Sequence, residues 1–324
     1  MKKIILLNLL AFIFIIIVFF ISIENLKQNK IMKNFIFLNT QKLVYISSYR
    51  NIWQTKLDCV RYDNYLIYYP KNTPCKFNNP EFKTILNFDD YGRIHPNQEL
   101  NGIEKNKKKI ALLGDSFSMG WGVNDNETFA YLLEKKLKKR VYNFGVSSYA
   151  TEREIHRFLQ SGTANEVETV LLQYSENDFE ENKKFHKANE NEKKKFFNLL
   201  IEYDKNKSKS RSFVPEYMRY LKNIFNFNFL KKMFFKNLNF DDHRNNLVKI
   251  IESFEELDNK KIIIFYINSN GEKFDNYHEN INSKNSNITF FDLNLQKKHY
   301  FALDDHLNSK GHKYAKDRLA EIVK

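Results

Sequence analysis

The sequence predicts an α/β fold in which helices cover both faces of a parallel sheet. From residue 110 onward, short apolar segments alternate with amphipathic ones, which is the pattern of strands buried on both faces and connected by helices. We expect the strands at 110–113, 141–144, 167–174, 261–267 and 288–293. We expect helices at 128–137, 151–159, 246–257 and 309–323.

Local signals support two further assignments within this domain. Thr151 is expected to cap the helix that follows it, with Glu154 three residues later completing a capping box. Residues 178–242 interrupt the alternation and are rich in Lys, Phe and Asn, which predicts a helical insert between the third and fourth strands. This insert either packs over the sheet edge or forms a lid or an aromatic surface for glycan or membrane contact.

The first 25 residues are predicted to form a transmembrane anchor. Residues 4–23 are almost wholly apolar, and about 20 such residues span a bilayer as a helix. Lys2 and Lys3 precede the span, so the N-terminus should stay in the cytoplasm and the rest of the chain should lie outside it. A cleaved signal peptide is the alternative, in which case the protein is secreted, although no good cleavage site follows.

Residues 26–108 are expected to form a juxtamembrane stalk and a small lead-in before the main domain, 109–324. Cys59 and Cys75 are the only cysteines, and a pair beyond an export segment indicates a disulfide. Two free buried thiols are the alternative. No Cys–His cluster suggests a metal site.

The formal net charge of +13 has two interpretations. The simpler one is a lysine-rich solvated surface, and the other is attraction to an anionic membrane or glycan. A nucleic-acid partner is poorly supported, because the chain has no recognition-helix signature, zinc spacing or aromatic-basic RNA motif. Nothing in the sequence indicates the oligomeric state.

The first expected strand runs directly into Gly114-Asp115-Ser116. A serine on a glycine-containing turn at the end of a buried strand is placed to act as a nucleophile. It needs a general base and an orienting acid, and the loop before the last helix contains Asp304, Asp305 and His306. That loop should lie at the carboxyl edge of the sheet and face Ser116.

Donors for an oxyanion follow the second and third strands. Gly145 lets a ligand approach its main-chain N–H, and the side-chain amide of Asn177 can point over the same edge. With the N–H of Ser116 they supply three donors, and removing one such donor typically costs about 3–4 kcal/mol of transition-state stabilisation.

These blocks together resemble the SGNH/GDSL hydrolase superfamily, in its bacterial, membrane-anchored form. The resemblance rests on Gly-Asp-Ser, on the runs 114–123 and 143–149, on Asn177 and on Asp304-x-His306, and it covers about 109–178 and 260–322. It implies a three-layer, flavodoxin-like α/β/α sandwich with a five-stranded parallel sheet. It also implies Ser116 as nucleophile, His306 as base, Asp304 as its partner, and an oxyanion hole of Ser116, Gly145 and Asn177.

Two departures from the family pattern affect this interpretation. Many members have the acid three residues before the histidine, where this chain has Leu303, so Asp304 is preferred and Asp305 remains an alternative. The third block is Ser-Glu-Asn-Asp at 175–178 and not Gly-x-Asn-Asp. The resemblance therefore implies less about the substrate than about the family.

The expected function is hydrolysis of O-acyl, chiefly O-acetyl, esters of a cell-surface glycan, outside the cytoplasm and without a cofactor. The alternatives are an O-acetyltransferase of surface polysaccharide, a lipase or thioesterase, and a catalytically silent glycan-binding protein. The expected partners are an acylated carbohydrate or other ester and, through the first helix, a membrane.

Overall fold

The computed structural model describes residues 41, 42, 45, 52–94, 108–209, 240–269 and 287–323, with the side chains of 204–209, 240 and 241 excepted. The chain divides into two compact units, Met1–Tyr49 and Arg50–Lys324. The second unit therefore contains both the main domain and the part of the lead-in that the structure describes. The predicted anchor, 1–25, lies outside the described residues. No helix within those residues has the length and apolar character needed to cross a membrane.

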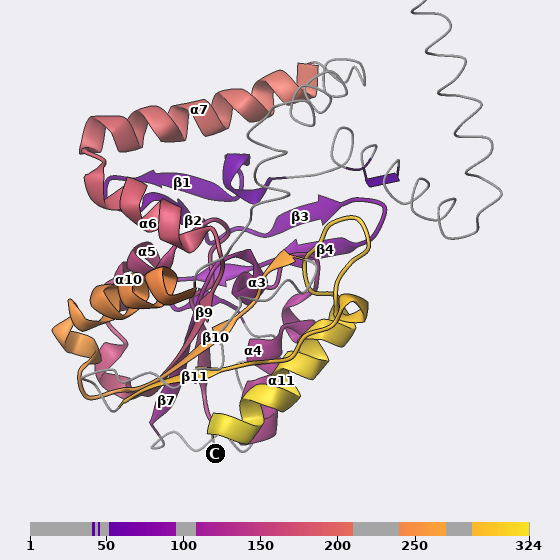
Figure 1. Cartoon of the computed structure of the whole chain (residues 1–324). Helices are drawn as coiled ribbons and strands as arrows, with labels where there is room; N and C mark the ends of the chain where they lie inside the picture. The colour runs from indigo at the N-terminus through magenta and orange to yellow at the C-terminus, as the bar shows by residue number, and fades with distance from the viewer. Residues whose placement is uncertain are drawn as a thin grey trace, which may run out of the picture. The chain divides into compact units, whose positions relative to one another are not determined.

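A five-stranded parallel sheet forms the centre of the second unit (Figure 1). Its strands are β7 (Lys109–Leu113), β8 (Val141–Asn143), β9 (Val167–Tyr174), β10 (Lys261–Tyr266) and β11 (Ile288–Phe291). The spatial order is β11-β10-β9-β7-β8, and all four pairings are parallel. The predicted α/β fold with a five-stranded parallel sheet is confirmed, and each expected strand is present within two residues at either end.

Helices cover both faces of the sheet because alternate strand residues point to opposite sides. On β7, Ile110 and Leu112 belong to one apolar core, whereas Ala111 and Leu113 belong to another. The first core includes α4 (Phe129–Leu137) and α11 (Ser309–Val323). The second includes α5 (Thr151–Gln160) and α10 (Phe240–Glu252). Figure 1 shows the two helix layers on either side of the strands.

The lead-in, residues 52–94, consists of a short 3₁₀ turn, η2 (Trp53–Thr55), and three two-stranded antiparallel units. The strands are β1 (Val60–Asp63), β2 (Ile67–Pro70), β3 (Cys75–Asn78), β4 (Lys83–Leu86), β5 (Phe88–Asp89) and β6 (Gly92–Arg93). Cys59 and Cys75 form a disulfide, as predicted, with Cα atoms 5.4 Å apart. A third apolar core joins Trp53 and Phe77 of the lead-in to Met119 and Trp121 of the main domain.

The insert begins with two helices, α6 (Asp178–Lys187) and α7 (Glu190–Lys209). Helix α7 contacts β2 and the η2 turn, and Phe185 and Phe197 join the lead-in core. In the described part of the insert, α7 therefore packs on the lead-in, whereas α6 also contacts α5 and α10 of the main domain. Residues 210–239 lie outside the described part, so its role as a lid or contact surface stays a prediction.

Two local expectations were wrong in detail. The N-cap of α5 is Ala150, so Thr151 is already the first helical residue and makes no capping box. Within the described residues, neither the Thr151 hydroxyl nor the Glu154 carboxylate has a hydrogen-bond partner, and both are fully buried. The helix expected at 246–257 begins earlier, at Phe240, and ends at Glu252.

Candidate active site

Ser116 lies where β7 turns into the short helix α3 (Ser116–Met119). The turn depends on Gly114, whose φ of 150° few other residues adopt. A β-carbon at this position would lie 2.4 Å from the Ser118 hydroxyl and 2.5 Å from Oε1 of Gln173. Only glycine therefore lets the strand end tightly enough to present Ser116, which is half-buried, at the sheet edge.

Asp115 has a structural role beside Ser116. It is the N-cap of α3, and its carboxylate accepts hydrogen bonds from the Phe117 N–H at 2.8 Å and the Ser175 hydroxyl at 2.9 Å. Gln173 accepts from the Asp115 N–H at 3.0 Å and donates to Ser175 Oγ at 2.7 Å. Burial raises the pKa of Asp115, against the lowering effect of these donors. The role of Gln173 in holding Asp115 and Ser175 was not predicted from the sequence, because its neighbours on β9 indicate only an apolar strand.

The structure brings Ser116, His306 and Asp304 into one hydrogen-bonded chain. Ser116 Oγ lies 2.8 Å from Nε2 of His306, and Nδ1 of His306 lies 2.5 Å from Oδ1 of Asp304. A neutral imidazole with its proton on Nδ1 donates a hydrogen bond to the Asp304 carboxylate and accepts one from the Ser116 hydroxyl at Nε2. The Asp304 side chain is 2% exposed and that of His306 is 18% exposed, so the base faces the solvent side of the site.

The loop that carries His306 is closed by its own backbone. The Phe301 N–H donates to the His306 carbonyl at 2.8 Å, and Tyr300 pairs with Leu307 as an isolated antiparallel bridge. The imidazole packs against the rings of Phe117 and Trp121, at centroid distances of 4.9 and 6.3 Å. Aromatic packing and the bond to Asp304 thus restrict the orientation of the imidazole.

A cavity of about 240 Å³ opens above these residues. It is lined by Ile52, Trp53, Gln54, Asp115, Ser116, Phe117, Trp121, Ser147, Ser148, Asn177, Asn268, Ser269, Asp304 and His306. Four of the predicted site residues therefore share one cavity. The lead-in supplies Ile52, Trp53 and Gln54. Their place in the cavity could not be expected from the sequence, because that segment lies outside the recognised blocks.

The predicted oxyanion donors do not all reach the cavity. Gly145 is absent from its lining, and its N–H donates to the Asn143 side chain at 3.1 Å. A β-carbon on Gly145 would lie 2.3 Å from the Met119 nitrogen, so this glycine is needed for close packing against α3. Asn177 does line the cavity, and its amide donates to Glu181 at 3.3 Å.

Ser148 is a cavity residue that the sequence did not single out. It has a left-handed backbone, with φ of 58°, and its hydroxyl accepts a hydrogen bond from Gln54 at 2.9 Å. Among the hydrogen bonds of the described residues, none uses the main-chain N–H of Ser148 or of Ser116 as donor. The positive φ of Ser148, which is uncommon for a residue other than glycine, is the feature that marks this position, and it cannot be predicted from the sequence.

A second cavity, of about 400 Å³, borders the first and shares Gln54 and Ser148 with it. Its walls are mainly apolar and come from the lead-in and the insert. The apolar lining residues are Ile67, Tyr68, Phe185, Ala188, Phe196 and Leu200. Arg153, Lys184, Lys193, Glu181 and Glu192 supply the charged groups.

The residues that the structure describes contain no group of three or more His, Cys, Asp or Glu side chains arranged to hold a metal ion.

Similarity to known proteins is found among solved structures. No family model matches the sequence. No curated protein matches it either. Among solved structures, the chain is similar to a G-D-S-L family protein from Desulfitobacterium hafniense DCB-2, with 14% sequence identity and a TM-score of 0.37. The match covers 66% of this chain and 99% of that one.

Proposed function

We propose that this protein is a serine esterase that removes O-acyl groups, chiefly O-acetyl, from a cell-surface glycan. The observation that carries the proposal is the chain of two hydrogen bonds from Ser116 through His306 to Asp304, at 2.8 and 2.5 Å, at the floor of a cavity. A serine, an imidazole and a carboxylate in this arrangement are the elements of nucleophilic acyl transfer.

In the proposed reaction, Ser116 Oγ attacks the ester carbonyl while His306 Nε2 takes the hydroxyl proton. The tetrahedral intermediate collapses as the C–O bond to the sugar breaks, and His306 returns that proton to the departing sugar oxygen. A water molecule then attacks the acyl-enzyme and loses a proton to His306. The bond between the acyl carbon and Ser116 Oγ breaks, His306 returns the proton to Oγ, and the carboxylic acid leaves. Asp304 holds the imidazole and stabilises its charged form throughout.

The oxyanion of the tetrahedral intermediate needs hydrogen-bond donors close to Ser116, at the carboxyl edge of the sheet. We assign this role to the N–H groups of Ser116 and Ser148 and to the side-chain amide of Asn177. Ser148 replaces Gly145 in this assignment, because it lines the cavity and its N–H is uncommitted among the described hydrogen bonds, whereas the Gly145 N–H is bonded to Asn143. Asn177 must turn from Glu181 to take part.

The glycan substrate is proposed from the expected location and not from a binding motif. The apolar segment 4–23, which lies outside the described residues, would anchor the catalytic unit on the outer side of the cytoplasmic membrane. There the acyl-enzyme could also pass its acyl group to a sugar hydroxyl, which would make the protein an O-acetyltransferase. Adding candidate acceptor sugars and measuring transfer against release of free acid distinguishes the two.

Replacing Ser116 with alanine tests the mechanism. We expect Ser116→Ala to abolish hydrolysis of p-nitrophenyl acetate and of acetylated glycan while the circular dichroism spectrum stays unchanged. Ser253→Ala, at an exposed position directly after α10, is the matched control and should keep full activity. A fluorophosphonate should label the wild type at Ser116. Full activity of Ser116→Ala would refute the mechanism, and failure of the wild type to react would favour a silent glycan-binding protein.

The second cavity favours one other candidate, a lipase or thioesterase. Because its apolar walls border the catalytic cavity at Gln54 and Ser148, a long acyl chain could extend into it while its carbonyl lies at Ser116. Comparing kcat/KM for p-nitrophenyl acetate, octanoate and dodecanoate separates the candidates. A preference for the long chains would replace the glycan acetyl ester as the proposed substrate.

A further inference from the structure

Glu81, in the lead-in, contacts the loop that carries the proposed acid and base. Its carboxylate accepts hydrogen bonds from three consecutive main-chain N–H groups, those of Ala302 at 2.8 Å, Leu303 at 2.9 Å and Asp304 at 2.8 Å. These residues are 221–223 positions away in sequence. Successive N–H groups that converge in this way form an anion-binding concavity in the backbone. Here the anion is a side chain of the same protein.

The position of Glu81 is itself fixed by its surroundings. It lies in the turn between β3 and β4, where Oδ1 of Asn79 accepts the N–H groups of Glu81 and Phe82, both at 3.0 Å. The ring of Phe82 packs on Phe301, which begins the loop, at 5.1 Å between centroids. The turn and the loop are therefore joined by an apolar contact beside the charged one.

The chemistry of the contact requires a carboxylate. Three N–H donors need acceptor atoms only, and an ionised carboxylate offers two oxygens with lone pairs for about four bonds. Hydrogen bonds to an ionised acceptor are about twice as strong as those between neutral groups. Glutamine would place an NH₂ group against one of the donors, so it keeps the volume of Glu81 but not its function.

We propose that Glu81 is a positioning residue for catalysis: its carboxylate holds the 302–304 backbone so that Asp304 keeps His306 aligned with Ser116. The proposal rests on the proposed function for the roles of Asp304 and His306. One of the three donors is the N–H of Asp304, the residue whose side chain bonds to Nδ1 of His306. Because a displacement of about 1 Å at a reacting group can cost about 100-fold in rate, loss of this contact should lower turnover.

Loss of the Glu81 carboxylate should change kcat and not KM. Glu81 does not line the catalytic cavity, so substrate binding should not depend on it. We expect Glu81→Ala to lower kcat by about 10- to 100-fold with KM little changed. Labelling of Ser116 by a fluorophosphonate should slow in parallel.

Chemical rescue separates positioning from a general loss of stability. Glu81 is half-buried, so formate can reach the space that Glu81→Ala leaves. We expect added formate to restore kcat of Glu81→Ala with p-nitrophenyl butyrate as substrate. Formate should not restore Glu81→Gln, whose side chain still fills the site. Asp58→Asn, an exposed lead-in acid, is the matched control and should show wild-type kcat with or without formate.

Hydrogen exchange of the 300–307 segment gives a readout that does not need turnover. The N–H groups of residues 302–304 should exchange faster in Glu81→Ala and slow again with formate, while exchange in β9 stays unchanged. Wild-type kcat in both Glu81 variants, or unchanged exchange in the segment, would overturn the proposal. If the wild type turns over no ester and resists labelling, the proposed function fails, and exchange alone decides whether Glu81 holds the loop.

Discussion

Asp304 and Asp305 are adjacent acids that the structure distinguishes sharply. The Asp304 carboxylate bonds to Nδ1 of His306 at 2.5 Å and is almost wholly buried. Asp305 adopts a left-handed backbone, with φ of 68°, and among the described residues Nδ1 of His306 bonds to Asp304 and not to Asp305. The ambiguity left by the motif spacing is therefore resolved by geometry in favour of Asp304 as the partner of the imidazole.

This difference predicts that substitution of the two acids has unequal effects on turnover. Asp304→Asn should lower kcat by about 10⁴-fold, since the amide favours the wrong imidazole tautomer, as in serine proteases. Asp305→Asn should have a small effect, because asparagine tolerates the left-handed conformation. Steady-state kinetics on p-nitrophenyl acetate would check both variants. A larger loss for Asp305→Asn would reverse the assignment.

Glu154 predicts a pH dependence of stability. Burial, and secondarily the neighbouring Asp178 and Asp115, raise the pKa of the Glu154 carboxyl well above its ordinary value, so the folded state holds the carboxyl proton more tightly than the unfolded chain does. The unfolded chain loses this proton above about pH 4.3, so the stability from Glu154 is complete below that pH. It is lost as pH rises toward the folded pKa, by up to about 1.4 kcal/mol per pH unit.

Replacing Glu154 with glutamine removes this titration. The melting temperature of Glu154→Gln relative to wild type should therefore rise between pH 5 and pH 8. Glu180→Gln, an exposed acid on α6, serves as the control and should show no such trend. A difference from wild type that is the same at both pH values would contradict the assignment of the shift to Glu154.

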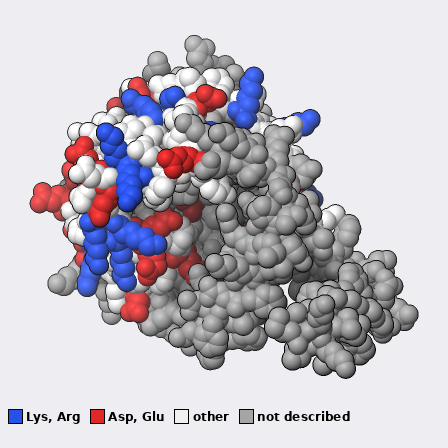
Figure 2. Space-filling view, turned by 90° about the horizontal axis from the view of Figure 1, so that it is seen from above, with Lys and Arg blue, Asp and Glu red and all other residues white. Residues whose placement is uncertain are grey.

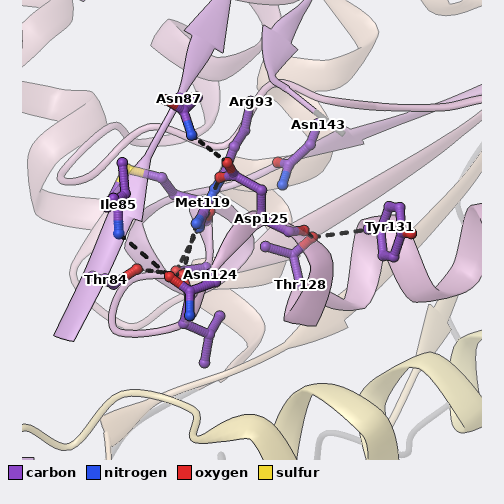
Figure 3. A network of polar contacts seen from close by, with 12 residues as sticks. Thr84, Ile85, Asn87, Arg93, Met119, Asn124, Asp125, Thr128, Tyr131 and Asn143 are labelled. Atoms are coloured by element: carbon purple, nitrogen blue, oxygen red, sulfur yellow. Dashed lines mark hydrogen bonds and ion pairs between the residues drawn. The ribbon is translucent and has the colours of Figure 1, made fainter. Parts of the chain in front are cut away.

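At the scale of elements, Arg93 of β6 holds the segment that follows α3. Its guanidinium donates to the carbonyls of Met119 and Gly120, both at 2.6 Å, and of Val123 at 2.7 Å. Its Nε pairs with Asp125 at 2.7 Å, and the Arg93 side chain is fully buried. Figure 3 shows Arg93 between Met119 and Asp125. Through this contact the lead-in fixes the segment directly after the Ser116 helix.

Removing the guanidinium should therefore be costly. Arg93→Met leaves Asp125 without its cation and removes a charged donor from the carbonyls of Met119, Gly120 and Val123, and breaking such a buried pair typically costs about 3–5 kcal/mol of unfolding free energy. Arg61→Met, at an exposed arginine over the Tyr69 ring, should cost less than about 1 kcal/mol. Urea denaturation would measure both. Equal effects would show that the buried network contributes little.

The elements that were predicted well are those decided by local pattern. Strand β9 and helix α11 match their predicted bounds, because long apolar or strongly periodic segments have few alternatives. The cap of α5 was mispredicted, because a Thr–Glu spacing permits a capping box without requiring one, and here the Glu154 side chain is buried instead. Burial of that side chain is a tertiary effect that no local signal contains.

At the scale of the whole molecule, the disulfide secures the lead-in on which Glu81 and Arg93 depend. It joins residues 16 positions apart, and a loop of about 15 residues corresponds to about 3 kcal/mol of stabilisation by the chain-entropy estimate. Cys59→Ser with Cys75→Ser should lower the unfolding free energy by that amount, as measured by denaturant titration. Addition of dithiothreitol to the double variant should then have no further effect, whereas it should destabilise the wild type.

The surface charge also belongs to this scale. On the face drawn in Figure 2, the described basic and acidic side chains are intermixed. Among the described residues, surface ion pairs join Lys136 with Asp317 and Lys139 with Glu168. For the described residues on that face, this arrangement fits the simpler interpretation of the +13 net charge, a solvated lysine-rich surface.

By itself, the sequence determined the sheet, its helices and the three residues now hydrogen-bonded as Ser116, His306 and Asp304, because periodicity and motif spacing are local properties. Only the tertiary structure decided which donors reach the cavity, how the lead-in completes it, and that Glu81 meets residues 302–304. Those contacts join segments as much as 223 residues apart. They depend on how separate elements pack together, and no pattern confined to one segment carries that information.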